Sequence, residues 1–194
     1  EADLLINQAA IDDYLERLFV ARTQGWLLCF TEGGHCHFLD VLEVPESGRA
    51  SRGQSIYALL DGADRADRIV SVIPVDDFEG DERFLLFRAR SGLLKRTPLS
   101  EFSNPRSGGI IAAGLKDDDR IQDVVATDGT GEVMLLSSAG RAIRFREDEI
   151  SVFGRTAQGV KGMDLKKGQE VVGMVLIRRE AAVLTVAADG VGKR

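Results

Sequence analysis

Arginine recurs along this chain close to glycines that themselves recur. The pairs lie in three polar segments and are Arg52 with Gly53, Arg106 with Gly109, and Arg155 with Gly159. Guanidinium groups bind phosphate oxygens through paired N–H donors, and phosphates recur along a nucleic acid. A repeated fold places equivalent residues at equivalent points of its surface, so the spacing predicts a basic track that suits a continuous polyanion.

Further basic residues extend this candidate track. In or beside the polar segments, which we call links, are Arg49, Arg52, Arg106, Arg155 and Lys161. In the strands that follow the predicted hairpin turns are Lys95, Arg96, Arg141 and Arg144. The alternative is that these are ordinary solubilising charges, but their recurrence in all three complete repeats favours the track.

Four predicted hairpins form the frame that positions these residues. A β-forming apolar run leads into each turn glycine, as in E-V-M-L-L-S-S-A-G-R-A-I-R-F from Glu132 to Phe145. Glycine adopts positive φ without steric cost, which suits a hairpin tip. Aligned on Gly34, Gly92, Gly140 and Gly190, the residues six positions earlier are Leu28, Leu86, Met134 and Leu184. We predict that these four side chains are buried at equivalent positions.

Hairpins and links repeat together about every 50 residues, which is typical of a propeller-like array of four-stranded blades. We predict an all-β fold of stacked antiparallel blades in a single domain over residues 1–194, with about three complete blades and a partial fourth. The expected blades are 14–60, 67–115, 119–165 and 169–194, with 1–12 as a tail or strand remnant. The first blade would begin with a strand from Tyr14 and end with one over Gln54–Leu60. Since the fourth repeat stops within its sheet, we expect a piece of a longer chain.

The totals limit the class of protein. The chain has 194 residues, 44% of them hydrophobic, which is enough for one substantial core. No apolar run approaches the roughly 18 residues of a membrane span, and two cysteines indicate a reducing, cytoplasmic setting. The net charge of −6 argues against indiscriminate nucleic-acid binding, but it permits a basic stripe on an acidic body.

Other groups that could do chemistry are poorly arranged for it. Cys29, His35, Cys36 and His37 are zinc-ligand types, but they match no known ligand spacing, so a buried thiol or two and surface histidines are favoured. The acidic clusters at 12–13, 76–77 and 117–119 are typical of solvated turns. No nucleotide-binding or hydrolase motif is present. We therefore predict no catalytic, cofactor or metal site.

The links resemble the C-terminal domain of the bacterial DNA gyrase A protein. The resemblance is carried by R-A-S-R-G-Q-S-I-Y-A-L-L (49–60), F-S-N-P-R-S-G-G-I-I-A-A-G-L (102–115) and G-R-T-A-Q-G-V-K-G-M-D-L (154–165). Two further segments, 93–102 and 133–145, resemble it as well. The similarity covers nearly the whole chain from about Asp12.

The resemblance implies a β-pinwheel that exchanges strands between blades and wraps double-stranded DNA on its basic outer rim to support negative supercoiling. It implies no catalysis in this part of an ATP-dependent type IIA topoisomerase, whose ATP and Mg sites lie in other domains. The implied partners are double-stranded DNA, the rest of the gyrase A protein and the gyrase B protein, in the bacterial cytoplasm. We expect no membrane partner.

One family hallmark, the gyrase box Q-R-R-G-G-K-G, is absent from the sequence. Truncation would explain this, and so would membership of the related topoisomerase IV proteins, whose box is degenerate. The dense similarity over 104–115 favours gyrase. A propeller that docks protein partners is a further alternative, which an apolar patch on one face would support.

Overall fold

The computed structural model describes residues 17–48, 51, 53–78, 80–116, 118–177, 182–186 and 190–194. These residues form strands and short 3₁₀ turns without an α-helix, which confirms the all-β prediction. No helix in these ranges is long and apolar enough to cross a membrane. The expected tail or strand remnant over 1–12 lies outside the described residues.

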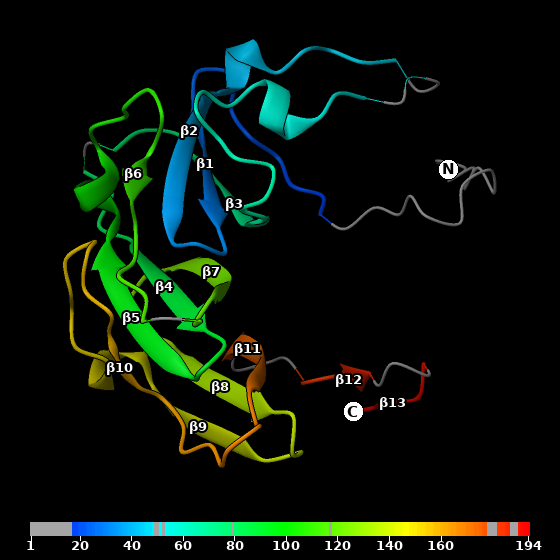
Figure 1. Ribbon diagram of the computed structural model, residues 1–194, viewed down its shortest axis with the longest axis vertical. Helices are drawn as coiled ribbons and strands as arrows, with labels where there is room; N and C mark the ends of the chain where they lie inside the picture. Colours follow the sequence, from blue (N-terminus) through cyan, green and yellow to red (C-terminus); the bar gives the residue numbers. More distant parts are fainter. Residues whose placement is uncertain are drawn as a thin grey trace.

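Three β-hairpins recur along the chain (Figure 1). They are β1 (Trp26–Thr31) with β2 (His35–Asp40), β4 (Phe84–Ala89) with β5 (Leu93–Pro98), and β8 (Glu132–Ser137) with β9 (Ala142–Arg146). The turn residues Gly34, Gly92 and Gly140 have φ of 83°, 84° and 71°. These three predicted turns are therefore confirmed, and residues aligned on the three glycines occupy equivalent positions in the hairpins.

Each hairpin pairs with strands from the repeat that follows it. These outer strands are β3 (Ile69–Val75), β6 (Ile110–Ile111), β7 (Ile121–Thr127), β10 (Val160–Lys161) and β11 (Val171–Ile177). The first sheet has the order β3-β1-β2-β6 and the second β10-β5-β4-β7, with every neighbouring pair antiparallel. The predicted blade ranges 14–60, 67–115 and 119–165 are thus repeats of the sequence. They do not coincide with the sheets, because each sheet combines strands from two successive repeats.

This exchange also changes how many sheets are complete. The third sheet has the order β11-β8-β9, and β12 (Thr185–Val186) pairs only with β13 (Gly192–Lys193) among the described strands. About three complete four-stranded blades were expected, but only two of the described sheets have four strands. Two strands predicted for the first repeat are also wrong within the described residues, because 17–22 form no strand and 54–60 contain the 3₁₀ turn η2 (Ile56–Ala58). No described hairpin precedes β1 to pair with them.

The sheets stack face to face with apolar side chains between them. Leu28 and Phe30 of the first sheet meet Leu85 and Phe87 of the second, and the rings of Phe30 and Phe87 lie edge to face with centroids 5.4 Å apart. The other face of the second sheet, including Leu86, packs against the third sheet. The middle sheet is therefore covered on both faces, which explains the apolar run over 84–87 in β4.

The predicted burial of the four aligned residues holds in part. Leu28 and Leu86 have no exposed surface, and Met134 is half-buried. Leu184 is 65% exposed, so its predicted burial is wrong. It lies beside β12, in a two-stranded sheet outside the buried clusters of the described chain.

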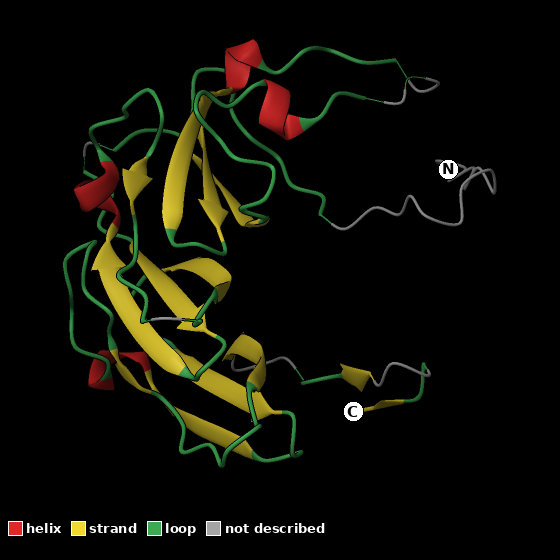
Figure 2. Ribbon diagram, viewed as in Figure 1, coloured by secondary structure: helices red, strands yellow, loops and turns green. Residues whose placement is uncertain are grey.

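Short 3₁₀ turns, which the sequence analysis missed, follow the second strand of each hairpin (Figure 2). They are η1 (Val41–Glu43), η3 (Leu99–Phe102) and η4 (Glu147–Glu149). Leu99 and Phe102 are fully buried, which anchors η3 in the core. Each turn leads the chain away from its hairpin and into the following link.

Glycines in the links lie directly on the hairpins. Gly109 and Gly159 have φ of 78° and 95°. A Cβ on Gly109 would lie 2.8 Å from the carbonyl oxygen of Cys36, and one on Gly159 would lie 2.1 Å from that of Leu94. Cys36 and Leu94 each come two residues after a turn glycine, so both links dock at the same point of their hairpins.

We therefore expect Gly159→Ala to destabilise the fold by more than the roughly 1 to 3 kcal/mol of an unfavourable φ alone, since its Cβ would also clash with Leu94. Gly140→Ala is the matched control, because Gly140 has positive φ but no atom within 4 Å of its added Cβ. Urea unfolding of both variants measures the difference. Equal losses would show that the docking of the link is not tight.

Candidate nucleic-acid interface

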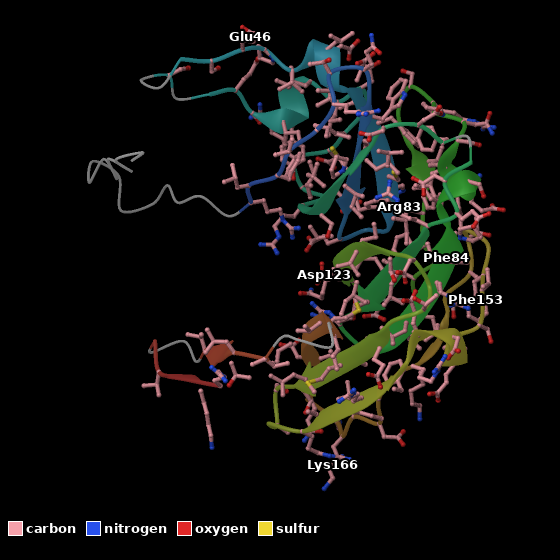
Figure 3. The ribbon with its side chains drawn as sticks, turned by 180° about the vertical axis from the view of Figure 1, so that it is seen from behind. Glu46, Arg83, Phe84, Asp123, Phe153 and Lys166 are labelled. Atoms are coloured by element: carbon pink, nitrogen blue, oxygen red, sulfur yellow. The ribbon has the colours of Figure 1, made fainter. Side chains whose placement is uncertain are left out.

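The second and third links lie along one edge of the stacked sheets, whereas the first link, which contains Glu46, extends on the opposite side (Figures 1 and 3). Strands β6 and β10 end the first two sheets on one side, whereas β3, β7 and β11 lie on the other (Figures 1 and 2). Figure 3, seen from behind, places Phe153 of the third link at the outer side and Asp123 of β7 opposite it. We call the outer side, formed by residues 103–111 and 151–161, the link edge.

Three of the predicted phosphate-binding residues lie on the link edge. Arg106 is exposed, in a turn closed by the Gly109 N–H donating to the Arg106 carbonyl at 3.0 Å. Arg155 is half-buried, and Lys161 is exposed in β10. Lys161 pairs with Asp164 at 2.6 Å, but an exposed pair of this kind contributes about 1 kcal/mol or less, so phosphate can replace the carboxylate. Arg49 and Arg52 lie outside the described residues.

Arg106 stands beside aromatic rings. It lines an open cavity of about 340 Å³ together with Trp26, His37 and Phe38. Burial lowers the pKa of His37, which is only 6% exposed, so its imidazole is neutral at pH 7. Glu43 and Asp61 line the same cavity, so Arg106 is a single cation beside two carboxylates in this part of the fold.

The predicted place of Lys95 in a surface track is wrong, because its side chain faces the protein interior. Its side chain is 2% exposed, and its Nζ lies 4.7 Å from the centroid of the Phe87 ring. Nζ donates to the carbonyl oxygens of Ala112 and Arg155. Burial, with a smaller effect of the Arg155 charge, lowers the pKa of Lys95 to about 7. In this position Lys95 holds backbone and does not reach phosphate.

Arg96 is also buried, between the second and third sheets. It is 9% exposed, its guanidinium lies 4.8 Å from the centroid of the Phe84 ring, and it donates to the Gly129 carbonyl at 3.3 Å. The fully buried Glu147 lies in the same region and accepts a hydrogen bond of 2.5 Å from Thr127. Burial raises the pKa of Glu147. Arg96 is thus part of the interior, where it cannot contact DNA.

The remaining two predicted residues belong to the third hairpin. Arg141 and Arg144 are exposed, and Arg144 pairs with Glu132 across β8 and β9. Both follow the turn at Gly140 and do not lie in a link. The structure does not bring them together with Arg106 and Arg155 on the link edge.

The possible zinc ligands are separated by the sheet. Cys29 and Cys36 are buried, and burial raises the pKa of Cys29 to about 12 and that of Cys36 as well, so both stay protonated. His35 faces solvent and pairs with Asp67 at 3.1 Å. Within the described ranges, no three His, Cys, Asp or Glu side chains are arranged to hold a metal ion.

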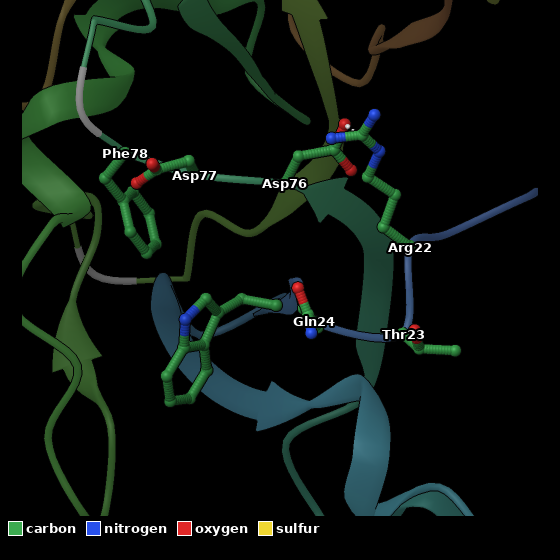
Figure 4. A pocket seen from close by; sticks show the side chains of 7 residues that line it. Arg22, Thr23, Gln24, Asp76, Asp77 and Phe78 are labelled. Carbon is green, nitrogen blue, oxygen red and sulfur yellow. Dashed lines mark ion pairs between the residues drawn. The ribbon is translucent and has the colours of Figure 1, made fainter.

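An open cavity of about 710 Å³ is lined by two aspartates (Figure 4). Asp76 and Asp77 lie beside Phe78, and Arg22 pairs with Asp76 at 3.6 Å. Two carboxylates, one of them paired with an arginine, make this cavity a poor place for phosphate.

Residues 25–76, 85–128 and 131–178 match the family described as "DNA gyrase C-terminal domain, beta-propeller". Each matched stretch contains one hairpin, and only the first residue of β4, Phe84, falls outside its stretch. The chain belongs to this family. The gyrase-family fold predicted from the links and hairpins is thereby confirmed.

Gyrase proteins from several bacteria are similar to this chain over nearly its whole length. The DNA gyrase A subunit of Salmonella typhimurium is 42% identical over 183 residues, which are 94% of this chain and 21% of the relative. That of Escherichia coli is 36% identical over the same coverage. The chain thus spans about a fifth of the length of these gyrase A proteins.

Solved structures show the same fold. The C-terminal domain of DNA topoisomerase IV superposes with a TM-score of 0.75 at 36% identity, covering 81% of this chain and 49% of that one. A DNA gyrase A C-terminal domain superposes with a TM-score of 0.71 at 24% identity, covering 89% and 54%. The two branches of the gyrase family therefore share these stacked sheets.

The buried Lys95 predicts a pH dependence of stability. An unfolded lysine keeps its proton to about pH 10.4, whereas folded Lys95 releases it near 7, so the unfolded chain binds more protons between these values. Raising the pH from 7 therefore stabilises wild type relative to Lys95→Met, by up to about 1.4 kcal/mol per pH unit.

Urea unfolding at about pH 6.5, 7.5 and 8.5 measures this slope, and the titration of unfolded cysteines near pH 8.5 cancels because wild type and Lys95→Met share it. Arg88→Met is the control, because it removes another buried cation, whose guanidinium donates to the Val171 carbonyl at 2.6 Å, and leaves Lys95 in place. It should keep the wild-type slope. Parallel curves for wild type and Lys95→Met would contradict a lowered pKa.

Proposed function

We propose that this chain binds double-stranded DNA along its link edge and bends it, without reading its sequence. The observation that carries the proposal is the docking of successive arginine-bearing links at equivalent points of successive hairpins. Backbone phosphates recur along a duplex in the same way, and contacts to them carry no base information. Membership of the gyrase family supports this assignment.

The distribution of charge supports the same face. The chain carries a net charge of −6, so DNA binding requires a local excess of positive charge. Arg106, Arg155 and Lys161 supply it on the link edge, whereas Asp76 and Asp77 line the acidic cavity. A duplex that follows the link edge avoids this cavity.

We place this activity within a larger enzyme. The gyrase A proteins that match are about five times longer than the matched stretch, so we assign strand cleavage, ATP and Mg to other parts of the enzyme. In this proposal the present chain is a non-catalytic wrapping element in the bacterial cytoplasm, and it acts with the rest of the gyrase A protein and with the gyrase B protein. Its bending of DNA would favour negative supercoiling.

A role in topoisomerase IV is the second candidate. The topoisomerase IV domain is 36% identical to this chain, whereas the solved gyrase domain is 24% identical. The two candidates differ in how strongly DNA is wrapped. Closing a nicked circle by ligation in the presence of the chain separates them, because strong wrapping leaves a change in linking number and simple binding leaves little.

The double variant Arg106→Glu/Arg155→Glu tests the link edge. We expect much weaker binding to duplex DNA and a salt slope lower by about two units, because two phosphate contacts are lost. Fluorescence anisotropy titrations between about 50 and 200 mM salt provide both quantities.

Arg68→Glu/Arg120→Glu is the matched control. These exposed arginines directly precede β3 and β7, on the side away from β6 and β10, and the double variant makes the same change in net charge. It should retain a slope close to that of wild type. If both double variants bind alike, the link edge is not the DNA-binding surface.

A further inference from the structure

Lys95 joins two links that belong to different repeats. Its two acceptors are the carbonyl of Ala112, which follows the second link and β6, and that of Arg155 in the third link. Both lie next to the link edge, although Lys95 itself belongs to β5 in the second sheet. A single buried side chain thus connects the segments that carry Arg106 and Arg155.

The segment that follows the second link also touches the third link directly. The Gly114 N–H donates to the Ala157 carbonyl at 3.2 Å. A Cβ on Gly114 would lie 2.3 Å from the carbonyl oxygen of Thr156, so the backbones leave no room for a side chain. Together with Lys95, this contact fixes how far apart the second and third links lie.

A buried lysine at this position is less stable than an apolar side chain would be, if packing is its only role. Burial disfavours its charged form, and an apolar side chain would fill the space without that cost. Two buried carbonyls need donors, however, and an amine supplies at least two N–H groups. The polar contacts account for a lysine here in a way that packing alone does not.

The equivalent positions in the neighbouring hairpins do not repeat this arrangement. Three residues after the turn glycine, Lys95 corresponds to His37 and Ile143. Among the described residues, only Lys95 is recorded as joining two links in this way. The connection is therefore specific to the junction of the second and third links.

We propose that Lys95 is a positioning residue for DNA wrapping, because it fixes the spacing between the phosphate contacts of Arg106 and Arg155. This inference rests on the proposed function. A duplex long enough to reach both links gains from their fixed spacing, since no link has to be ordered on binding. A duplex that reaches only one link gains nothing from it.

The test compares duplexes of about 10 and about 40 base pairs on the 194-residue chain with Lys95→Met. We expect affinity for the long duplex to fall about tenfold, with little change for the short one. The salt slope should stay at its wild-type value, because no phosphate contact is removed. Lys95→Gln should restore part of the long-duplex binding, since its amide again supplies two N–H donors without a buried charge.

Two matched pairs of variants separate positioning from stability. Arg88→Met removes a buried cation that contacts β11 and neither link, so it should lower the melting temperature without weakening long-duplex binding. Gly114→Ala pushes the links apart and leaves Lys95 intact, so it should weaken the long duplex even if Lys95→Met fails to fold. Gly154→Ala is its control in the same third link, because nothing lies within 4 Å of its added Cβ.

Three results would overturn the positioning role: equal losses in Lys95→Met and Arg88→Met, equal losses on both duplexes, or a lower salt slope in Lys95→Met. The last would mean that Lys95 touches phosphate itself. The charge-reversal variant decides the other question separately. If Arg106→Glu/Arg155→Glu binds DNA like wild type, the DNA-binding proposal fails. If that double variant loses binding while Lys95→Met binds like wild type, only the positioning role is rejected.

Discussion

Backbone pairing between each hairpin and the following repeat is the constraint on which this structure depends. A hairpin strand with a free edge exposes unpaired N–H and C=O groups, and here the next repeat supplies the missing strands. The same pairing fixes the links, since Ala112 donates to the Gly34 carbonyl at 2.8 Å and Gly162 to that of Gly92 at 2.9 Å. The positions of the second and third links are therefore set by the repeat before each of them.

Much of the frame could be predicted from sequence because it rests on local rules. A turn glycine between two β-forming runs specifies a hairpin, and the positive φ at Gly34, Gly92 and Gly140 is the physical reason for the recurring glycine. Strand exchange could not be derived in this way. Residues 54–60 have the composition of an outer strand, yet they form η2 where no described hairpin precedes them. Their partner, and not their composition, decides the outcome.

The surface position expected for the candidate residues is wrong for the two in β5. Lys95 and Arg96 look like solvent-exposed charge in a single sequence, but β5 lies between sheets that cover both of its faces. Alternation along a strand indicates two faces without saying that both are buried. The apolar run over 84–87 in β4 was a usable signal, because it indicates a sheet covered on both faces, in which the charges of the hairpin partner need buried acceptors.

The buried contacts of Lys95 make the link edge a surface of fixed spacing. A duplex of 20 to 30 base pairs costs about 1 to 6 kcal/mol to bend, and flexible loops would add the cost of their own ordering. Here the link glycines dock on hairpin carbonyls, and Lys95 and the Gly114 backbone hold neighbouring links together. The spacing of the phosphate contacts is then determined by sheet packing in the interior. In this proposal, an acidic protein bends a polyanion with few surface cations, because each cation is held where a phosphate of the bent DNA passes.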